Sequence, residues 1–431
     1  MPSTDESRLL SRRRAIELGA VGFGALLGGC VAGDAGGQSD TTVASPATDE
    51  TPTTDETTQF PPPEPTSEEP TDARPLPTGS DWPRVGHDDA NTGHAPVTAV
   101  PGESEVYWHF FTQSTPPVVS DGKTYAVEHA RDTYLLSRDA STAEKQWTTT
   151  FSGGAFAPPV VAEDRVVLQT YSFLWAFDRS GEELWQYDLG RGIPGSPVVR
   201  DGRVYGCTGS FEHWSPTAFA VAADGTERWT VELDGDVRGS PAADEDTLYV
   251  GTGAGTLYAL ALPDGSERWS VQLGDGTAGT ATVADGAVYV ADRDDTIHAR
   301  SAADGSSLWT AGVDTSGDES LAVADGSVFV PATDAVVSLS TDDGTEQWRR
   351  SVGSPTAPSV GESAVYVGGT TADDPNVYAI DRETGDVAWH HRTESKQVSD
   401  QIFTGVSGPP IPVEGGLYAV AADGLYAFGA P

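Results

Sequence analysis

Cysteine is nearly absent from this chain, which contains only Cys30 and Cys207 among 431 residues. A framework of several disulfides is therefore excluded, and if Cys30 is consumed during processing no intramolecular disulfide can form at all. Asparagine is equally scarce, and neither Asn91 nor Asn376 lies in an Asn-x-Ser/Thr glycosylation acceptor. The fold must therefore be held by packing, hydrogen bonds and ions.

Positive charge is the second thing that the chain lacks. Lys and Arg number 25 against 65 Asp and Glu, which gives a formal net charge of −40, and lysine occurs only at 123, 145 and 396. So acidic a chain argues against nucleic acid or an anionic membrane surface as a partner. It also repels itself unless counter-ions screen the charge, over a Debye length of about 3 Å at molar salt. The composition therefore indicates a halophilic protein.

Long hydrophobic runs are missing as well. The most apolar stretch follows Ser-Arg-Arg-Arg at 11–14, is interrupted by Glu17 and glycines, and is too short to span a membrane. The arginines resemble a twin-arginine export motif, and the stretch ends in Leu-Gly-Gly-Cys at 27–30, which resembles a lipobox. We expect residues 1–30 to be an export signal with lipidation at Cys30. A cleaved signal or a retained hydrophobic anchor is the alternative.

Residues 31–79 contain almost no large apolar side chain before Phe60 and are rich in Thr, Pro, Asp, Glu, Ser and Gly. Such a segment cannot bury enough surface to offset the conformational entropy of folding. The Pro-Pro-Pro-Glu-Pro run at 61–65 stiffens part of it towards polyproline II. We expect a disordered stalk that carries a folded domain away from the membrane.

What the chain does have is a repeat. Tryptophans recur at intervals of 38, 44, 40, 40, 39 and 41 residues, and one more lies 39 residues before the first of these. A period of about 40 residues is typical of β-propellers, whose blades each have four strands. The series consists of Trp108, Trp147, Trp185, Trp229, Trp269, Trp309, Trp348 and Trp389.

Residues 280–309 show the repeating unit most plainly. Three short β-branched or aromatic runs are separated by two Asp-Gly pairs, and the unit closes with Gly-x-x-x-Trp. Asp-Gly between alternating strands is a strong hairpin signal, because a type I′ turn needs positive φ at both central residues. Each unit is therefore expected to form four antiparallel strands, A to D in chain order.

The two ends of the series decide the number of blades. Seven units are complete, residues 409–431 supply three strands without a fourth, and residues 105–110 supply a fourth strand without the first three. Joining these pieces makes an eighth blade and hides two edge strands. We therefore predict that residues 105–431 form an all-β, eight-bladed propeller of four-stranded antiparallel blades, in which an N-terminal strand completes the C-terminal blade.

A lead-in segment, residues 80–104, precedes the first strand and contains DWPRVGHDDANTGHAP at 81–96. A folded lead-in that Trp82 packs against the ring is the favoured interpretation. The alternative is a metal site, although the spacing of the available ligands fits no standard one. These ligands would be His87, Asp88, Asp89 and His94.

The repeats resemble the PQQ-like (pyrroloquinoline-quinone-type) β-propeller family. They carry Ser/Thr-Pro-x-Val near strand A, Val-Tyr-Val in strand B, Leu-Tyr-Ala-Leu in strand C and a Gly four residues before the Trp of strand D; the unit that ends at Trp147 departs from this last feature. The Trp-Pro and Asn-Thr-Gly of the lead-in are similar too. By pattern the chain resembles lipoproteins of the outer-membrane assembly factor (BamB) type, and its acidity and lipobox look haloarchaeal.

This resemblance implies that each Trp packs between neighbouring blades and that the protein is a non-enzymatic scaffold for protein–protein interaction. In an organism without an outer membrane, the assembly role itself would not carry over. The family also includes quinoprotein dehydrogenases, whose site needs a calcium-binding set of carboxylates and amides, a catalytic Asp and, in many members, a Cys pair. This chain has no adjacent cysteines and only two Asn, so we expect no PQQ.

Two further functions stay open as alternatives: a PQQ- or metal-dependent oxidoreductase, and a carbohydrate-binding surface protein. Structural calcium is conceivable at two oxygen-rich turns, although neither follows an EF-hand spacing and such residues are more often solvated. The first turn contains Asp244 and Asp246, and the second contains Asp292, Asp294 and Asp295.

Loop length gives the positional evidence about function. In a meander of four strands the A–B and C–D turns emerge at one end of the ring, where they are short, and the B–C and D–A loops emerge at the other, where they vary. Functional residues tend to lie on variable loops held by a rigid scaffold. We therefore place the interaction face at the B–C/D–A end. Its candidates are Phe211, His213 and Trp214 in loop 209–216, Lys396, Asp400 and Gln401 in loop 390–408, and Arg191 and Arg238 near the channel mouth.

Three of these candidates have a plainer explanation: Trp214 could pack on its own blade, and Arg191 and Arg238 could pair with neighbouring Asp. As partners we expect other cell-surface or exported proteins, with no nucleic acid. The membrane would be reached through the lipid at Cys30, on the outer face of the cytoplasmic membrane.

Overall fold

The structure is a computed structural model, and every regular element that it describes is a β-strand. No helix in this part of the chain is long and apolar enough to cross a membrane. The predicted export signal and most of the predicted stalk lie outside the described residues. These residues are 74–76, 79–100, 102–129, 133–155, 157–190, 195–209, 215–237, 239–274, 276, 278–315, 320–398 and 401–431.

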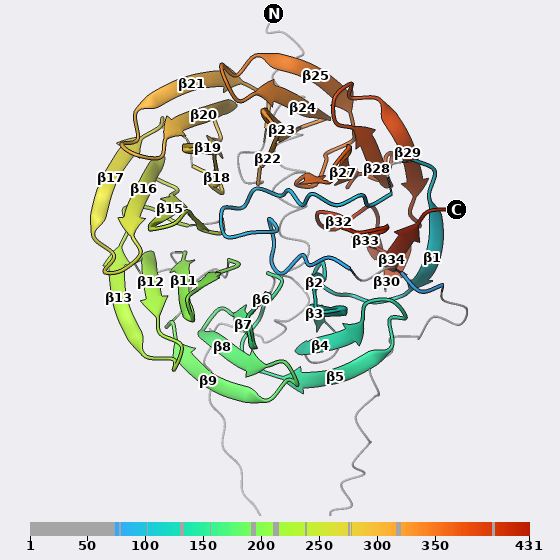
Figure 1. The fold of residues 1–431 in the computed structure, drawn as a ribbon, viewed down its shortest axis with the longest axis horizontal. Helices are drawn as coiled ribbons and strands as arrows, with labels where there is room; N and C mark the ends of the chain where they lie inside the picture. Colours follow the sequence, from blue (N-terminus) through green and yellow to red (C-terminus); the bar gives the residue numbers. More distant parts are fainter. Residues whose placement is uncertain are drawn as a thin grey trace, which may run out of the picture. The chain divides into compact units, whose positions relative to one another are not determined.

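Eight four-stranded antiparallel sheets stand around a central axis as the blades of a propeller (Figure 1). In each blade strand A lies nearest the axis and strand D lies at the rim. The predicted all-β, eight-bladed fold is therefore confirmed.

Blade 1 consists of β2 (Val118–Ser120), β3 (Lys123–His129), β4 (Thr133–Asp139) and β5 (Lys145–Thr150). Blade 2 consists of β6 (Val160–Ala162), β7 (Arg165–Gln169), β8 (Phe173–Asp178) and β9 (Glu183–Asp188). Blade 3 consists of β10 (Val198–Arg200), β11 (Arg203–Thr208), β12 (Thr217–Val221) and β13 (Glu227–Glu232). Blade 4 consists of β14 (Ala242–Ala243), β15 (Thr247–Gly251), β16 (Thr256–Ala261) and β17 (Glu267–Gln272). Blade 5 consists of β18 (Thr282–Ala284), β19 (Ala287–Ala291), β20 (Thr296–Ser301) and β21 (Ser307–Gly312). Blade 6 consists of β22 (Ala322–Ala324), β23 (Ser327–Ala332), β24 (Ala335–Ser340) and β25 (Glu346–Ser351). Blade 7 consists of β26 (Ser359–Val360), β27 (Ala364–Gly368), β28 (Asn376–Asp381) and β29 (Val387–Arg392). Blade 8 consists of β32 (Ile411–Val413), β33 (Gly416–Ala421), β34 (Gly424–Gly429) and β1 (Glu105–Phe110).

The ring closes through β1, the first strand of the chain and the outer strand of the last blade. It pairs antiparallel with β34, from Glu105 opposite Gly429 to Phe110 opposite Leu425, with a bulge between Val106 and Trp108. In Figure 1 the cyan β1 lies beside the red β34 at the rim. The predicted closure is confirmed, and it removes the two free edges that an open ring would have.

The local sequence explains the blade. Strand B of blade 4, β15, is buried along its whole length, whereas the outer β17 alternates between exposed and half-buried residues. This is the pattern expected of a strand packed on both faces and of a strand at the rim. The A–B turn of blade 5 has positive φ at both Asp285 (49°) and Gly286 (77°), as a type I′ turn requires.

Tryptophan side chains tie each blade to its neighbour in the ring or to the lead-in. Trp147 Nε1 donates a hydrogen bond to the backbone carbonyl of Arg179 in blade 2 (3.0 Å), and Trp389 donates to Val100 of the lead-in (2.7 Å). In the unit that ends at Trp147, Ala143 takes the place of the usual Gly with φ of 61°. The remaining donor–acceptor pairs are Trp108–Ser141, Trp185–Ala223, Trp229–Leu262, Trp269–Ala302, Trp309–Thr341 and Trp348–Arg382.

Candidate functional site

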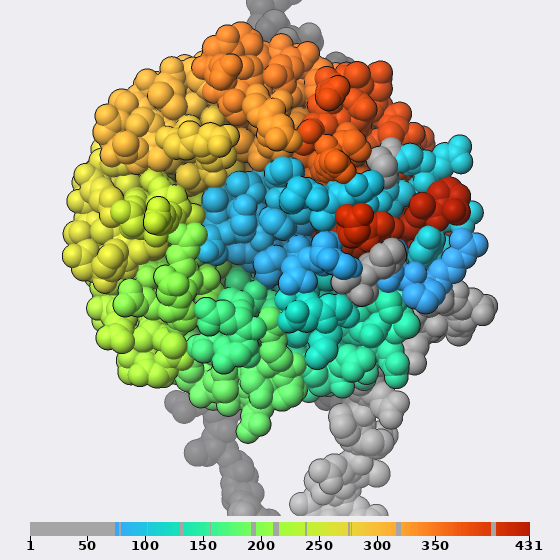
Figure 2. All heavy atoms as spheres, in the orientation of Figure 1, coloured from blue at the N-terminus to red at the C-terminus, as the bar shows by residue number. Residues whose placement is uncertain are grey.

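The two ends of the ring differ because the lead-in occupies one of them. Residues 79–100 run across the centre of the ring (Figure 1) and form the blue band across the middle of the face in Figure 2. Their backbone bonds the inner strand of blade after blade just before the A–B turn, and in blade 8 it bonds the turn itself. The backbone pairs are Trp82–Val119, Pro83–Val161, Asp89–Ala243, Ala90–Val283, Thr92–Val323, Ala95–Val360 and Thr98–Gly415.

Blade 3 is reached by side chains instead, through Arg84. Its guanidinium donates to the carbonyl of Ser196 (3.4 Å) and to Asn91 Oδ1 (2.7 Å). Asn91 in turn donates to the carbonyls of Pro241 (3.1 Å) and Ala281 (3.0 Å), in blades 4 and 5. Both side chains are 2 % exposed, and burial lowers the pKa of Arg84. All eight blades therefore contact the lead-in at the A–B/C–D end.

The four polar residues of the lead-in that could be drawn as metal ligands serve this packing. Asp88 accepts hydrogen bonds from the Thr92 amide (2.9 Å) and hydroxyl (2.6 Å). Asp89 pairs with Arg200 at 3.2 Å, and burial raises the pKa of Asp89. The ring of His87 lies edge-on to that of Trp82, 4.8 Å between centroids. His94 forms a parallel bridge with Val360. Trp82 is 1 % exposed, as a packed lead-in requires.

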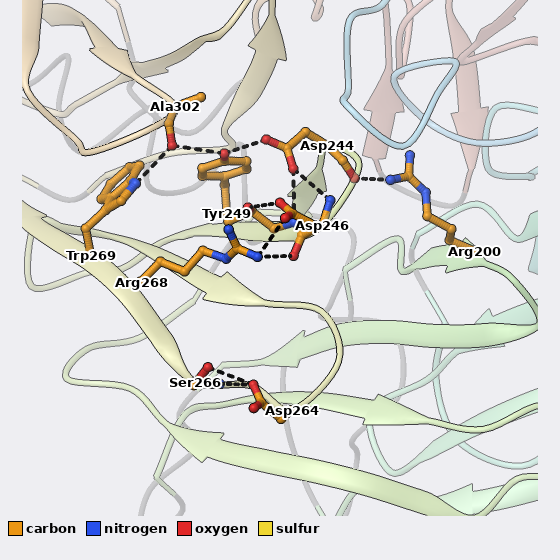
Figure 3. Close-up of polar contacts among 10 residues, drawn as sticks. Arg200, Asp244, Asp246, Tyr249, Asp264, Ser266, Arg268, Trp269 and Ala302 are labelled. Carbon is orange, nitrogen blue, oxygen red and sulfur yellow. Dashed lines mark hydrogen bonds and ion pairs between the residues drawn. The ribbon is translucent and has the colours of Figure 1, made fainter.

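The first oxygen-rich turn uses its carboxylates internally, as Figure 3 shows. Asp244 Oδ1 accepts hydrogen bonds from the amides of Asp246 (3.1 Å) and Thr247 (2.9 Å), and its Oδ2 accepts one from the Tyr249 hydroxyl (2.7 Å). The Asp246 carboxylate pairs with Arg268 at 2.8 Å. These oxygens therefore point at partners within blade 4.

The second turn contains a buried pair that sequence reasoning missed. Asp292 Oδ1 accepts from the amides of Asp294 (2.9 Å) and Thr296 (3.0 Å), while Oδ2 lies 2.7 Å from His298 Nε2. Asp292 is 2 % and His298 4 % exposed. His298 occupies the strand C position that is Tyr258 in blade 4. Among the residues that the structure describes, no group of three or more His, Cys, Asp or Glu is arranged to hold a metal ion.

Most of the predicted interaction residues lie outside the described part of the chain. Those at the B–C/D–A end that do so are Arg191, Phe211, His213, Trp214, Arg238 and Asp400. Lys396 and Gln401 are placed, and they belong to one feature. Lys396 begins β30 (Lys396–Val398) and Gln401 begins β31 (Gln401–Phe403), which pair as a two-stranded ribbon between blades 7 and 8 of the chain.

The ribbon has one face on the ring and one in solvent. Lys396 lies opposite Phe403, and its Nζ is 4.1 Å from the centroid of the Phe111 ring. Gln397 lies opposite Ile402, one residue along and therefore on the other face. Ile402 is 67 % exposed, more than any other large hydrophobic side chain in the described residues. The ribbon thus presents an apolar side chain at the end of the ring that the lead-in leaves uncovered.

A polar cluster anchors the base of this insertion, and no local pattern in the sequence signals it. The Asp423 carboxylate, in the B–C turn of blade 8, accepts hydrogen bonds from the Glu394 amide (3.3 Å) and from the Tyr426 hydroxyl. The Tyr426 ring contacts two imidazoles, with centroids 4.1 Å from His109 and 5.5 Å from His391. The cluster joins strands from both ends of the chain and the outer strand of blade 7.

Eight four-stranded blades, whose tryptophans bond to the next blade or, at Trp389, to the lead-in, define a β-propeller of PQQ-like repeats. The family model described as "Outer membrane protein assembly factor BamB" matches residues 89–188, 172–278, 215–316 and 253–430. The chain therefore belongs to this family. Comparison with curated proteins gave no match.

Solved structures share the fold at low sequence identity. The quinohemoprotein alcohol dehydrogenase of Comamonas testosteroni superposes with a TM-score of 0.66 at 16 % identity, over 82 % of this chain and 81 % of that one. A europium-containing methanol dehydrogenase gives 0.68 at 14 % identity, over 81 % and 98 %. BamB of Moraxella catarrhalis gives 0.42 at 20 % identity, over 70 % and 78 %. A propeller scaffold hosts unrelated functions, so the similarity to the two dehydrogenases shows the shared fold alone.

Proposed function

We propose that this protein is an exported, lipid-anchored propeller that acts as a non-enzymatic scaffold for other cell-surface or exported proteins. Cys30 carries the lipid, and residues 31–73 form the stalk. The predicted stalk ends before residue 79, because Leu76 is buried and its amide donates to the carbonyl of Ser141 in blade 1. The ring stands outside the cytoplasmic membrane. Support comes from the family, whose description is that of an assembly factor. The export motif, lipobox and stalk composition of the sequence agree with it.

The proposal rests on one observation: the lead-in covers one end of the ring and leaves the other end uncovered. At the A–B/C–D end the inner strands are bonded by the lead-in, so their backbone groups are unavailable to a partner. At the B–C/D–A end the loops vary in length, and the β30–β31 ribbon exposes Ile402. An exposed apolar side chain on a two-stranded ribbon fits a protein partner better than a small polar ligand.

Site-specific photo-cross-linking in intact cells tests this surface. A photoreactive residue at 402 is compared with one at Leu308, which is 53 % exposed on the rim of blade 5. We expect position 402 to give a discrete adduct with an exported protein that also binds the purified ring, and Leu308 to give none. Equal labelling from both positions, or no adduct that binds the purified ring, would argue against a scaffold that works through this end.

The anchor is tested separately by Cys30→Ser. We expect the wild-type protein to fractionate with membranes and the variant to appear in the medium or to keep an uncleaved signal. If the variant and the wild type fractionate alike and neither carries a lipid by mass spectrometry, the anchoring part of the proposal is wrong. The interaction surface would be unaffected by that result.

A further inference from the structure

Where blades 7 and 8 meet, titratable side chains pack around one tyrosine ring. His391, on β29, is half-buried, and its ring centroid lies 5.5 Å from that of Tyr426 and 5.2 Å from that of Phe428. His109, on β1, lies opposite Tyr426 in the β1–β34 pair and stacks on its ring at 4.1 Å between centroids. Its Nε2 is 3.1 Å from the backbone carbonyl of Asp423 and 3.6 Å from the carboxylate.

Asp423 connects this stack to the insertion. It is 7 % exposed, and one of its carboxylate oxygens accepts from both Tyr426 and the Glu394 amide. No donor in the described residues reaches its other oxygen, Oδ1, which is buried. Two residues after Glu394, the ribbon begins at Lys396. The same carboxylate therefore holds the closing strand, blade 8 and the start of the insertion.

Other charged and titratable groups surround the stack on the elements packed against it. On β29 these are His390, which lies 3.4 Å from Asn376 Oδ1, and the exposed Arg392. The insertion contributes Glu394 and Lys396. Within blade 7, Asp374 accepts a hydrogen bond from Tyr378, whose ring is 5.7 Å from that of His390.

We propose that His391, His109, Tyr426 and Asp423 form an acid-released clasp, which holds residues 394–398 and 401–407 against the ring while His391 is neutral and loosens them when His391 gains a proton. This inference rests on the proposed function, because it supplies regulation of the same interaction face. Acidification changes how firmly the β30–β31 ribbon is presented to a partner.

The direction follows from where the charge would be. A neutral imidazole packs well against Tyr426 and Phe428, whereas an imidazolium there gives up hydration. Burial accordingly lowers the pKa of His391; the charge of Asp423 opposes this effect, and His109 and His390 add to it. The Asp423 carboxylate is already shared among His109, the Tyr426 hydroxyl and the Glu394 amide, so it compensates a charge on His391 only in part. On acidification the His391 side chain is therefore the one that moves out of its contact with Tyr426 and Phe428.

The pH window follows from the sign of the shift. A histidine whose pKa is lowered in the closed state imposes no penalty while both states are neutral, so the clasp is intact above the ordinary value of 6.5. As pH falls through that value the open state takes up the proton first, and the clasp weakens. We expect opening to increase severalfold between pH 7.5 and 5.0, because the open state binds the proton more tightly than the closed state does.

Hydrogen exchange followed by mass spectrometry tests the clasp on the full chain at constant high salt. Rates at pH 7.5 and 5.0 are corrected for the intrinsic pH dependence of amide exchange. We expect peptides that cover 394–407 to lose protection at pH 5.0, while a peptide from blade 4, residues 247–261, which contains no histidine or acidic residue, does not change. In His391→Phe, a neutral ring that keeps the packing, the pH response should disappear.

A second variant and a folding check complete the experiment. His391→Gln should also be insensitive to pH, and near-ultraviolet circular dichroism shows whether each ring is intact. An unchanged pH response in either folded variant, or no response in the wild type, would overturn the clasp. The measurement needs no partner, so the clasp can fail while cross-linking from position 402 succeeds, and the reverse can also occur.

Discussion

Gly265 of blade 4 lies directly against the indole of Trp229 in blade 3, so close that a Cβ at this position would stand 2.7 Å from Trp229 Cε3. Its φ is +72°, in the left-handed region that glycine adopts freely. Equivalent contacts recur around the ring and explain why the motif has no side chain four residues before the Trp. They are Gly181–Trp147, Gly225–Trp185, Gly305–Trp269, Gly344–Trp309 and Gly385–Trp348.

Gly265→Ala should therefore destabilise the ring twice over, through left-handed strain and through overlap with Trp229. We expect the free energy of unfolding to fall by about 2–4 kcal/mol. Gly286→Ala is the matched control: its φ is +77°, but a Cβ there meets nothing within 4 Å, so it should lose only about 1 kcal/mol. Denaturant unfolding of both variants measures the difference, and equal losses would mean that the Trp contact contributes nothing.

This contact also shows how far the sequence could be followed. The intervals between tryptophans, the Asp-Gly turns and the incomplete end units were sufficient to predict eight blades and their closure, because each is a local pattern with a fixed period. The same pattern could not show that Gly265, which precedes Trp269 by four residues, supports Trp229 instead. The Gly and Trp positions of one motif serve two different blade interfaces.

The lead-in carries the second prediction. The Asn91 side chain accepts a hydrogen bond from Arg84 and donates to two carbonyls, in blades 4 and 5. Asn91→Gly leaves these buried polar groups without partners, so we expect the free energy of unfolding to fall by about 2–4 kcal/mol. Asn91 has φ of 57°, and Asn91→Ala should therefore lose about 1 kcal/mol more than the glycine variant. Unfolding curves with unchanged midpoints would show that the lead-in does not stabilise the ring.

Such contacts could not be predicted from the sequence, because the partners are far apart in the chain. Arg84 and Ser196 are separated by 112 positions, and Asn91 and Ala281 by 190. The sequence indicated only that Trp82 packs somewhere on the ring. The clasp was missed for the same reason, since His109 and Asp423 come together only when the ring closes.

The third prediction concerns Cys207, which is 2 % exposed at the end of β11. Burial raises the pKa of its thiol to about 12, and the reactive species is the thiolate. We expect no alkylation by iodoacetamide at pH 8 in the native protein. One equivalent should react after unfolding if Cys30 is lipidated. Rapid labelling of Cys207 in the native state would contradict its burial.

The fourth prediction uses the aspartates of the C–D turns. Asp264 Oδ1 accepts hydrogen bonds from the Ser266 hydroxyl (2.7 Å) and amide (3.0 Å), visible in Figure 3. The Ser266 hydroxyl is the largest cause of the lowered pKa of Asp264. A lowered pKa contributes stability above the ordinary value of 3.8 that is lost as pH falls below it. Asp224, Asp304 and Asp343 are capped in the same way.

Asp264→Asn should consequently lower the free energy of unfolding at pH 7 and differ less from the wild type at pH 3. Chemical unfolding at both pH values, at constant ionic strength, measures this convergence. Convergence of the two proteins at pH 3 would assign the stability that is lost in acid to the ionised aspartates of the C–D turns. A gap between variant and wild type that is as large at pH 3 as at pH 7 would assign the effect to something other than the ionised carboxylate.

The fifth prediction sets the scaffold against the oxidoreductase. The carboxylates of Asp244 and Asp292 bond the amides of their own turns, and Asp246 pairs with Arg268, so a calcium ion would have to displace these partners. We therefore expect that adding pyrroloquinoline quinone and calcium produces no dye reduction with alcohols or sugars. Calcium should raise the melting temperature no more than magnesium does at equal ionic strength. Saturable quinone binding with calcium-dependent turnover would establish the enzyme instead, and a calcium-specific thermal shift alone would restore the structural-calcium hypothesis without it.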